Sequence, residues 1–206
     1  MNFGVTGGLY AFMGLWGVRL LCGSHGMSNE AASGYITVLL LAFAFGCVFF
    51  GWLSDRLRLR KAVLVGGNFG YLLLWVLFWA VMPGGGFLLF LLMAGLGLLA
   101  GASTLGFALS KESNDPRSSG VAVAVVNMGT FVGVSAMQPI FGWLLDLRWR
   151  GILDDGVRIY GYDAYREAAL LMVAFALLGF LASFFTKETH CQNTARAQAG
   201  GPTGMD

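Results

Sequence analysis

Six long apolar runs are the feature that most constrains the fold of this chain. They occupy residues 3–23, 34–53, 62–82, 87–109, 120–144 and 168–186, and polar segments separate them. About 20 apolar residues in a helix cross a bilayer, so each run is long enough to span it. Only helices and closed barrels satisfy their backbone groups inside a membrane. We therefore predict an all-α membrane protein with six transmembrane helices within residues 1–186.

Composition and charge exclude several other classes of protein. Of the 206 residues, 57% are hydrophobic and only 12% are charged, whereas soluble chains contain about 25% charged residues. The net charge is only +2 and there is no long basic run, so the sequence lacks the clustered positive charge that is typical of nucleic-acid-binding proteins. Neither H-E-x-x-H nor a Walker loop is present, and His190-Cys191 alone is a weak metal signal. We expect no enzyme activity, no cofactor, no metal site and no nucleic-acid partner.

The ends of the runs give further expectations. Ser28 and Asp163 are placed to act as N-caps of the second and sixth helices. After Thr186 the chain becomes polar, and we expect a disordered cytoplasmic tail over residues 187–206. The first run starts after only two residues, with no basic segment or cleavage site of a signal peptide. This abrupt start predicts a chain that lacks something upstream.

Lysine and arginine are divided unequally between the two ends of the predicted bundle. Eight lie on the side of the loops at 54–61 and 110–119, and four lie on the other side, between residues 148 and 166. Cytoplasmic loops carry an excess of Lys and Arg. We therefore expect both termini on the cytoplasmic side.

The end of the second run is repeated at the end of the fifth. Phe50-Gly51-Trp52-Leu53-Ser54-Asp55 and Phe141-Gly142-Trp143-Leu144-Leu145-Asp146 are 91 positions apart. This predicts two three-helix repeats, 3–82 and 87–186. Because each repeat crosses the membrane three times, the second repeat starts on the opposite side and is inverted relative to the first. Inverted triplets are typical of secondary transporters. The alternative is chance convergence, because Trp favours the membrane interface and Asp the water beyond it.

The second run closes with a longer motif. Gly51-x-Leu53-Ser54-Asp55-Arg56-x-x-x-Arg60-Lys61 resembles the signature between the second and third helices of a half in the major facilitator superfamily. Val126-Asn127-Met128-Gly129 and Gln138-Pro139 resemble the penultimate helix of bacterial members. The resemblance implies a bacterial inner-membrane carrier of twelve helices, of which this chain supplies the carboxyl-terminal six.

The chemistry of this motif suits a gate. Gly51 permits a close helix contact, and Asp55 can accept hydrogen bonds from a helix N-terminus. Arg56, Arg60 and Lys61 supply donors to carbonyls, carboxylates or anionic lipids. The residues alone favour a role in fixing topology and holding the loop. The resemblance favours gating, because in the family the aspartate partners a helix of the opposite half.

Two polar stripes are candidates for a substrate path. On the fifth run Asn127, Thr130, Ser135 and Gln138 fall within about 140° at roughly 100° per residue. Pro139 leaves the carbonyl of Ser135 free, which suits a wet cavity. Hydrogen bonding between helices explains this stripe equally well. Asn2, Thr6 and Tyr10 form the second stripe, on the first run.

Charges and glycines inside the runs are informative as well. Arg19 is the only charge within a run, so it is a candidate to hold an anionic substrate, although snorkelling to the outer interface is the simpler account. No Asp or Glu lies within a run, so either the proton-coupling group lies in a partner half or the transport is not proton-coupled in that way. Glycine pairs four residues apart predict close helix contacts: Gly4/Gly8, Gly66/Gly70, Gly97/Gly101 and Gly129/Gly133.

These observations predict transport of a small solute of unknown class. The chain is expected to work by alternating access as part of a secondary transporter, or permease, in the lipid bilayer, with a second half or as a homodimer. The alternative is a non-transporting membrane protein, either a truncated remnant or an interaction partner that docks its glycine-rich faces onto other helices.

Overall fold

The computed structural model describes residues 1–154 and 156–194, which form helices and one short hairpin. The first span combines α1 (Val5–Ala11), the π-helical segment η1 (Phe12–Trp16) and α2 (Gly17–His25); α3 (Asn29–Leu57) and α4 (Arg60–Val81) follow. The fourth span combines α5 (Gly86–Ala100), the 3-10 segment η2 (Gly101–Thr104) and α6 (Leu105–Glu112). The hairpin of β1 (Leu153–Asp154) and β2 (Val157–Arg158) separates α7 (Ser119–Leu147) from α8 (Tyr162–Ser183).

Among the described residues, six helical segments are long and apolar enough to cross a membrane, which confirms the predicted fold class. Ser28 is the N-cap of α3, and its hydroxyl accepts from the Ala31 N–H at 3.3 Å. The expectation for Asp163 is wrong, because α8 already begins at Tyr162 after the N-cap Gly161. Hydropathy identifies only the part of a helix that lies in the membrane. The N-terminus of α8 lies outside that part, so its first residue could not be located from the apolar run.

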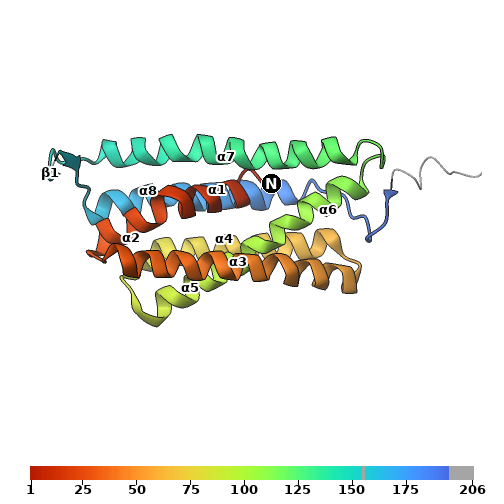
Figure 1. The fold of residues 1–206 in the computed structure, drawn as a ribbon, viewed down its shortest axis with the longest axis horizontal. Coiled ribbons are helices and arrows are strands. Elements are labelled where there is room, and N and C mark those ends of the chain that lie inside the picture. Colours follow the sequence, from red (N-terminus) through yellow and green to blue (C-terminus); the bar gives the residue numbers. More distant parts are fainter. Residues whose placement is uncertain (155, 195–206) are drawn as a thin grey trace, which may run out of the picture.

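The helices pair as two inverted triplets predict. The first span packs on the fifth span, α7, and the fourth span packs on the second span, α3. The two contacts are equivalent, because each joins the first helix of one triplet to the second helix of the other. The third and sixth spans, α4 and α8, pack on each other. An offset of 91 residues also places η1 opposite residues 103–107, which overlap η2, so both equivalent spans leave α-helical geometry at corresponding positions in the sequence. Figure 1 shows α7 along one edge of the bundle and α5 at the opposite edge.

Glycines carry the closest helix contacts. A methyl group at Gly97 would overlap the carbonyl oxygen of Leu39, and one at Gly101 would overlap the backbone of Gly46. At the other crossing, a methyl group at Gly133 would overlap the carbonyl oxygen of Phe3. Small residues at such points let backbones approach closely, which holds helices together in lipid.

The bundle has two chemically different ends. We call the end with residues 54–61, 110–119 and 184–194 the motif end, and the end with residues 24–28, 82–85 and 148–161 the hairpin end. Three arginines of the hairpin end form ion pairs: Arg148 with Glu167 at 2.6 Å, Arg150 with Asp163 at 3.6 Å and Arg158 with Asp146 at 2.7 Å. Arg166 instead lies over the ring of Trp79. Most of the positive charge at the hairpin end is therefore balanced locally.

The contact at Gly97 gives a direct test of this packing. We expect Gly97→Ala to destabilise the bundle by about 1–3 kcal/mol, because its methyl group must push α3 away from α5. The matched control is Gly129→Ala, where nothing lies within 4 Å of the added carbon, and a better helix former adds about 0.5–1 kcal/mol. Thermal unfolding in detergent measures both variants. Equal melting temperatures for the two would contradict the packing described here.

Candidate functional site

A charged cluster at the motif end is built around Arg60, the first residue of α4. Its side chain is 10% exposed, and its guanidinium meets three partners from two segments. Nη1 lies 2.7 Å from Asp55 Oδ1 and donates to Ser54 Oγ at 2.6 Å. Nη2 donates to Glu112 Oε1, at the end of α6, at 2.8 Å. Taking a guanidinium out of water is costly unless it is paired and hydrogen-bonded, and these contacts meet that requirement.

Glu188 supplies the missing cap of α4. The N-cap residue Leu59 makes no side-chain hydrogen bond. Instead Glu188 Oε1 accepts from the Arg60 N–H at 2.8 Å and Oε2 accepts from the Lys61 N–H at 2.9 Å. A carboxylate at this position satisfies free N–H groups and favours the positive end of the helix dipole.

The environment of Glu188 shifts its pKa. Burial raises the pKa of the carboxyl, but backbone N–H groups of His190, Arg60, Lys61 and Thr189 donate to the carboxylate and together lower the pKa below its ordinary value. Glu188 is thus held in its charged form by the fold itself.

Residues around Glu188 fasten the same segment to the motif. Thr189 donates to Glu112 through its hydroxyl, and the Cys191 thiol points to the Ser54 carbonyl oxygen at 3.6 Å. Lys61 Nζ donates to the Phe184 carbonyl oxygen at 2.7 Å, just beyond α8. Residues 187–194 are therefore packed, which corrects the expectation of a disordered tail for this part. The rest of that expectation, residues 195–206, lies outside the described residues.

The remaining motif residues make fewer contacts. Gly51 has nothing within 4 Å of an added methyl position, so its side of α3 is open. Leu53 is half-buried, and exposed Arg56 lies over the Trp52 ring. Asp55 is 63% exposed, and Arg60 is the partner that the described residues give it. The N-terminus of α4, which follows Asp55 in the chain, is capped by Glu188 and not by Asp55.

Sequence reasoning missed Glu112, Glu188 and Thr189. Arg60 is separated by 52 positions from Glu112 and by 128 from Glu188. The two carboxylates follow the fourth and sixth spans in segments that the pattern describes only as polar. The sequence carries no local signal for these residues, because the fold alone brings them to Arg60 over these separations.

The polar stripe on α7 is divided by the packing of α1. Thr130 is buried where Gly7 of α1 approaches it, and its hydroxyl has no partner among the described residues. Gln138 is half-buried, and Asn127 and Ser135 are exposed. The four residues share a helix face as predicted, but only the part away from α1 is open.

The residues of the first span have separate surroundings. Thr6 is buried and shares a hydrogen bond of 2.7 Å with Ser103 of η2, so its hydroxyl joins two helices. Tyr10 is half-buried with its ring edge-on to Phe43 of α3. Arg19 is exposed near the hairpin end, with its guanidinium 5.9 Å from the centre of the Trp16 ring. The structure does not gather the three residues into one site.

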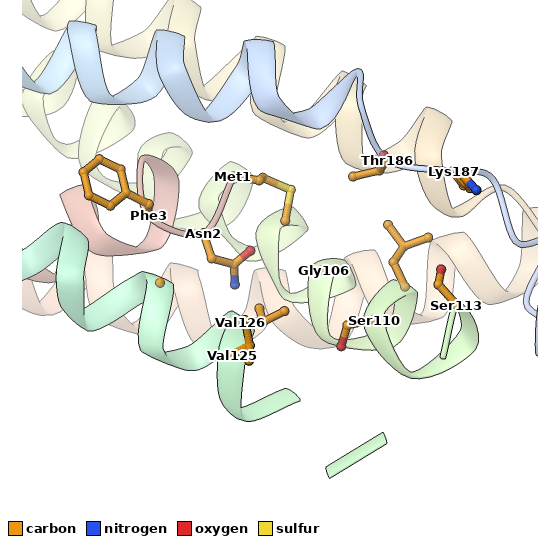
Figure 2. A pocket seen from close by; sticks show the side chains of 12 residues that line it. Met1, Asn2, Phe3, Gly106, Ser110, Ser113, Val125, Val126, Thr186 and Lys187 are labelled. Carbon is orange, nitrogen blue, oxygen red and sulfur yellow. The ribbon is translucent and has the colours of Figure 1, made fainter. Parts of the chain in front are cut away.

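A cavity of about 390 Å³ opens between the start of the first span, α6, α7 and the segment after α8. Its polar lining consists of Asn2, Ser110, Ser113, Thr186 and Lys187. Asn2 is buried, and both polar atoms of its amide lack a partner among the described residues. Figure 2 shows these side chains around the cavity, with Phe3 toward one end and Lys187 toward the other. Except for Asn2, sequence reasoning did not single out these polar residues.

The comparison with protein families decides the class of this chain. The model of the Major Facilitator Superfamily matches residues 1–204. The chain belongs to the Major Facilitator Superfamily. This family consists of transporters, so the chain is a multi-pass integral membrane protein of a transporter family. No curated protein matches the chain.

The cap by Glu188 gives a test at the motif end. We expect Glu188→Ala to release residues 187–194, since a lost helix cap costs about 0.5–2 kcal/mol. N-ethylmaleimide should then alkylate Cys191 several-fold faster, as measured by peptide-resolved mass spectrometry. The control is Glu30→Ala, an exposed glutamate of α3 at the hairpin end.

Acid should weaken the same contact in the native chain. Because the pKa of folded Glu188 lies below the ordinary 4.5, its contribution to stability is complete above that value and is lost as pH falls through the lower folded pKa. The melting temperature of Glu188→Ala should therefore fall less steeply below pH 4.5 than that of the native chain. Identical Cys191 alkylation in Glu188→Ala and native protein would refute the cap.

Proposed function

We propose that this chain forms one six-helix half of a major facilitator carrier that moves a small solute by alternating access. The observation that carries the proposal is the family match over residues 1–204 on a bundle paired as two inverted triplets. Such bundles bind substrate near the bilayer midplane and rock against a partner half. The partner is a second half or a second copy of this chain.

Exposed polar groups on otherwise apolar helices support a solute path. Asn127 and Ser135 are exposed on α7, Gln138 is half-buried beside them, and Pro139 leaves the Ser135 carbonyl without its helical donor. Polar groups that face lipid are costly, so this face suits a wet path between two halves.

The Arg60 cluster supports a gate at the motif end. Asp55 is mostly exposed while its partner Arg60 is mostly buried, so Asp55 is free on one side to meet another helix. The open side of α3 at Gly51 is next to it. A charge contact that forms in one conformation and breaks in the other biases the two states. Arg56 and Lys61 add positive charge around this contact.

The resemblance of the fifth span to penultimate helices supports the assignment as a carboxyl-terminal half. Val126-Asn127-Met128-Gly129 and Gln138-Pro139 carry it. The excess of Lys and Arg at the motif end supports an orientation with that end in the cytoplasm of a bacterial inner membrane, because cytoplasmic loops carry such an excess.

A non-transporting interaction protein remains a second candidate. Apolar side chains are exposed along α3 at Leu41, Phe45, Val48 and Trp52, and such a stripe also fits permanent contact with other membrane helices. The difference between the two candidates is solute movement.

Reconstitution tests the transport proposal. Proteoliposomes that contain the chain, alone or with an amino-terminal six-helix half, are assayed with a broad panel of radiolabelled sugars, amino acids and organic acids. We expect uptake of at least one solute, reduced about tenfold by Asp55→Asn because the charged contact of the gate is lost. Arg117→Gln, in the exposed loop of the same end, should transport normally. An absence of uptake across the panel would favour the second candidate.

Orientation has an independent test. In intact cells a membrane-impermeant maleimide should leave Cys191 unmodified, whereas inside-out vesicles should allow its modification, since Cys191 lies at the motif end. Modification of Cys191 in intact cells would reverse the proposed topology.

A further inference from the structure

A second cavity, of about 400 Å³, lies at the hairpin end. Its walls come from the end of the first span, the first residue of α3, the segment after β2 and the first turn of α8. The side chains that matter for its chemistry are Trp16, Arg19, Cys22, Arg158, Tyr160 and Tyr165. None of the contacts of the Arg60 cluster reaches this end of the bundle. The cavity is therefore a separate feature of the molecule.

The two guanidinium groups of this cavity differ in their charge balance. Arg158 Nη1 lies 2.7 Å from Asp146 Oδ1, which also accepts from the Tyr160 hydroxyl at 2.6 Å. The Arg158 guanidinium also lies 4.7 Å from the centre of the Trp149 ring. Arg19, by contrast, has no carboxylate within ion-pair distance among residues 1–154 and 156–194. The cavity therefore carries one positive charge that the described residues do not balance.

A buried donor without an acceptor lies in the same wall. Trp16 is 8% exposed, and its indole Nε1–H is fully buried without a partner in the described part of the chain. The indole is fixed because its ring stacks on Phe141 at a centroid distance of 4.7 Å. Buried polar groups in native proteins nearly always have a partner. This donor atom lies below the surface of the cavity, so Trp16 offers the cavity its ring and not its N–H.

Tyr165 forms a rigid side of the cavity. A methyl group at Gly23 would overlap the Tyr165 ring, so the glycine lets the ring rest directly on α2. Tyr165 is also packed edge-on to Tyr160, with ring centroids 6.2 Å apart. Together with Trp16 and Ile159 these rings form the apolar part of the cavity wall, and Arg19, Cys22, Asn29 and Arg158 form the polar part. That composition is typical of sites for small organic ligands.

We propose that this cavity binds a small organic anion, with one carboxylate or similar oxyanion group on an apolar body. The oxyanion pairs with the Arg19 guanidinium, and the apolar body lies against the rings of Trp16, Tyr160 and Tyr165. A guanidinium donates to an oxyanion through charge-assisted hydrogen bonds. The volume of about 400 Å³ lies within the range of small-molecule sites. The inference rests on the proposed function in assigning an anionic class to the solute.

Cys22 provides a reporter inside the cavity. It lines the wall, is half-buried, and donates to Asn29 Oδ1 at 3.3 Å. The protein is placed in phosphatidylcholine nanodiscs, and alkylation by N-ethylmaleimide is followed for each cysteine by peptide-resolved mass spectrometry. Benzoate is the probe, and benzamide is its neutral counterpart of nearly equal shape. Cys191, at the motif end, reports any general effect on alkylation.

We expect benzoate to slow alkylation of Cys22 about threefold or more at concentrations of twice its Kd or above. Benzamide should leave the rate nearly unchanged, and neither compound should affect Cys191. Arg19→Gln should abolish the protection, and Arg19→Lys should keep it at a higher benzoate concentration. The matched control is Arg166→Gln, an exposed arginine of α8 that does not line the cavity.

Three results would overturn the proposal. The first is unchanged Cys22 alkylation in benzoate, and the second is equal protection by benzoate and benzamide. The third is protection that appears only in phosphatidylglycerol nanodiscs without benzoate, which would assign the site to a lipid headgroup. The measurement reads binding without flux, so a failure of transport in proteoliposomes leaves it intact. Conversely, transport without protection of Cys22 would reject this cavity and keep the proposed function.

Discussion

Helices in a bilayer gain little by exchanging lipid tails for apolar neighbours, so close contact between backbones must hold the bundle together. The crossing of α3 and α5 depends on Gly46, Gly97 and Gly101, where even one added carbon would meet main-chain atoms. The equivalent crossing of α1 and α7 depends on Gly7 and Gly133. These two crossings set the positions of the first and fourth spans, and through them the openings at both ends of the molecule.

Polar groups then have to be satisfied within the space that this packing leaves. At the motif end Arg60 is desolvated, and carboxylates from α3 and α6 pair with it. At the hairpin end the opposite holds for Arg19, whose charge and neighbouring indole donor remain unmatched by the described residues. Carboxylates pair with arginines at both ends, but among the described residues Arg19 is left without one. This asymmetry separates the part that holds the bundle from the part that can receive a ligand.

Hydropathy was sufficient to predict six spans, because crossing a membrane requires long apolar runs whatever the detailed packing. The Ser28 cap was also predictable, since its partner Ala31 is three residues away. Contacts over long separations were not: Glu188 lies 128 positions from the N–H of Arg60, and no local pattern marks it.

Glycine spacing identified Gly97 and Gly101 correctly, but it gave Gly66 and Gly129 the same status although both face open space. A spacing shows that two residues share a face, and only the fold shows which face has a neighbour. For the same reason Thr130 is buried and Ser135 exposed on one predicted stripe.

The attachment of residues 187–194 has a mechanical consequence. Glu188 holds the first N–H groups of α4, Lys61 holds the last carbonyl region of α8, and the two helices pack along their length. The third and sixth spans are thereby fastened to each other at the motif end. They cannot slide past each other without breaking these contacts. Bending is left to the first and fourth spans, where η1 and η2 already interrupt the regular hydrogen bonding of the helix. The molecule therefore combines one clamped pair of helices, α4 and α8, with two spans that have irregular segments where bending can occur.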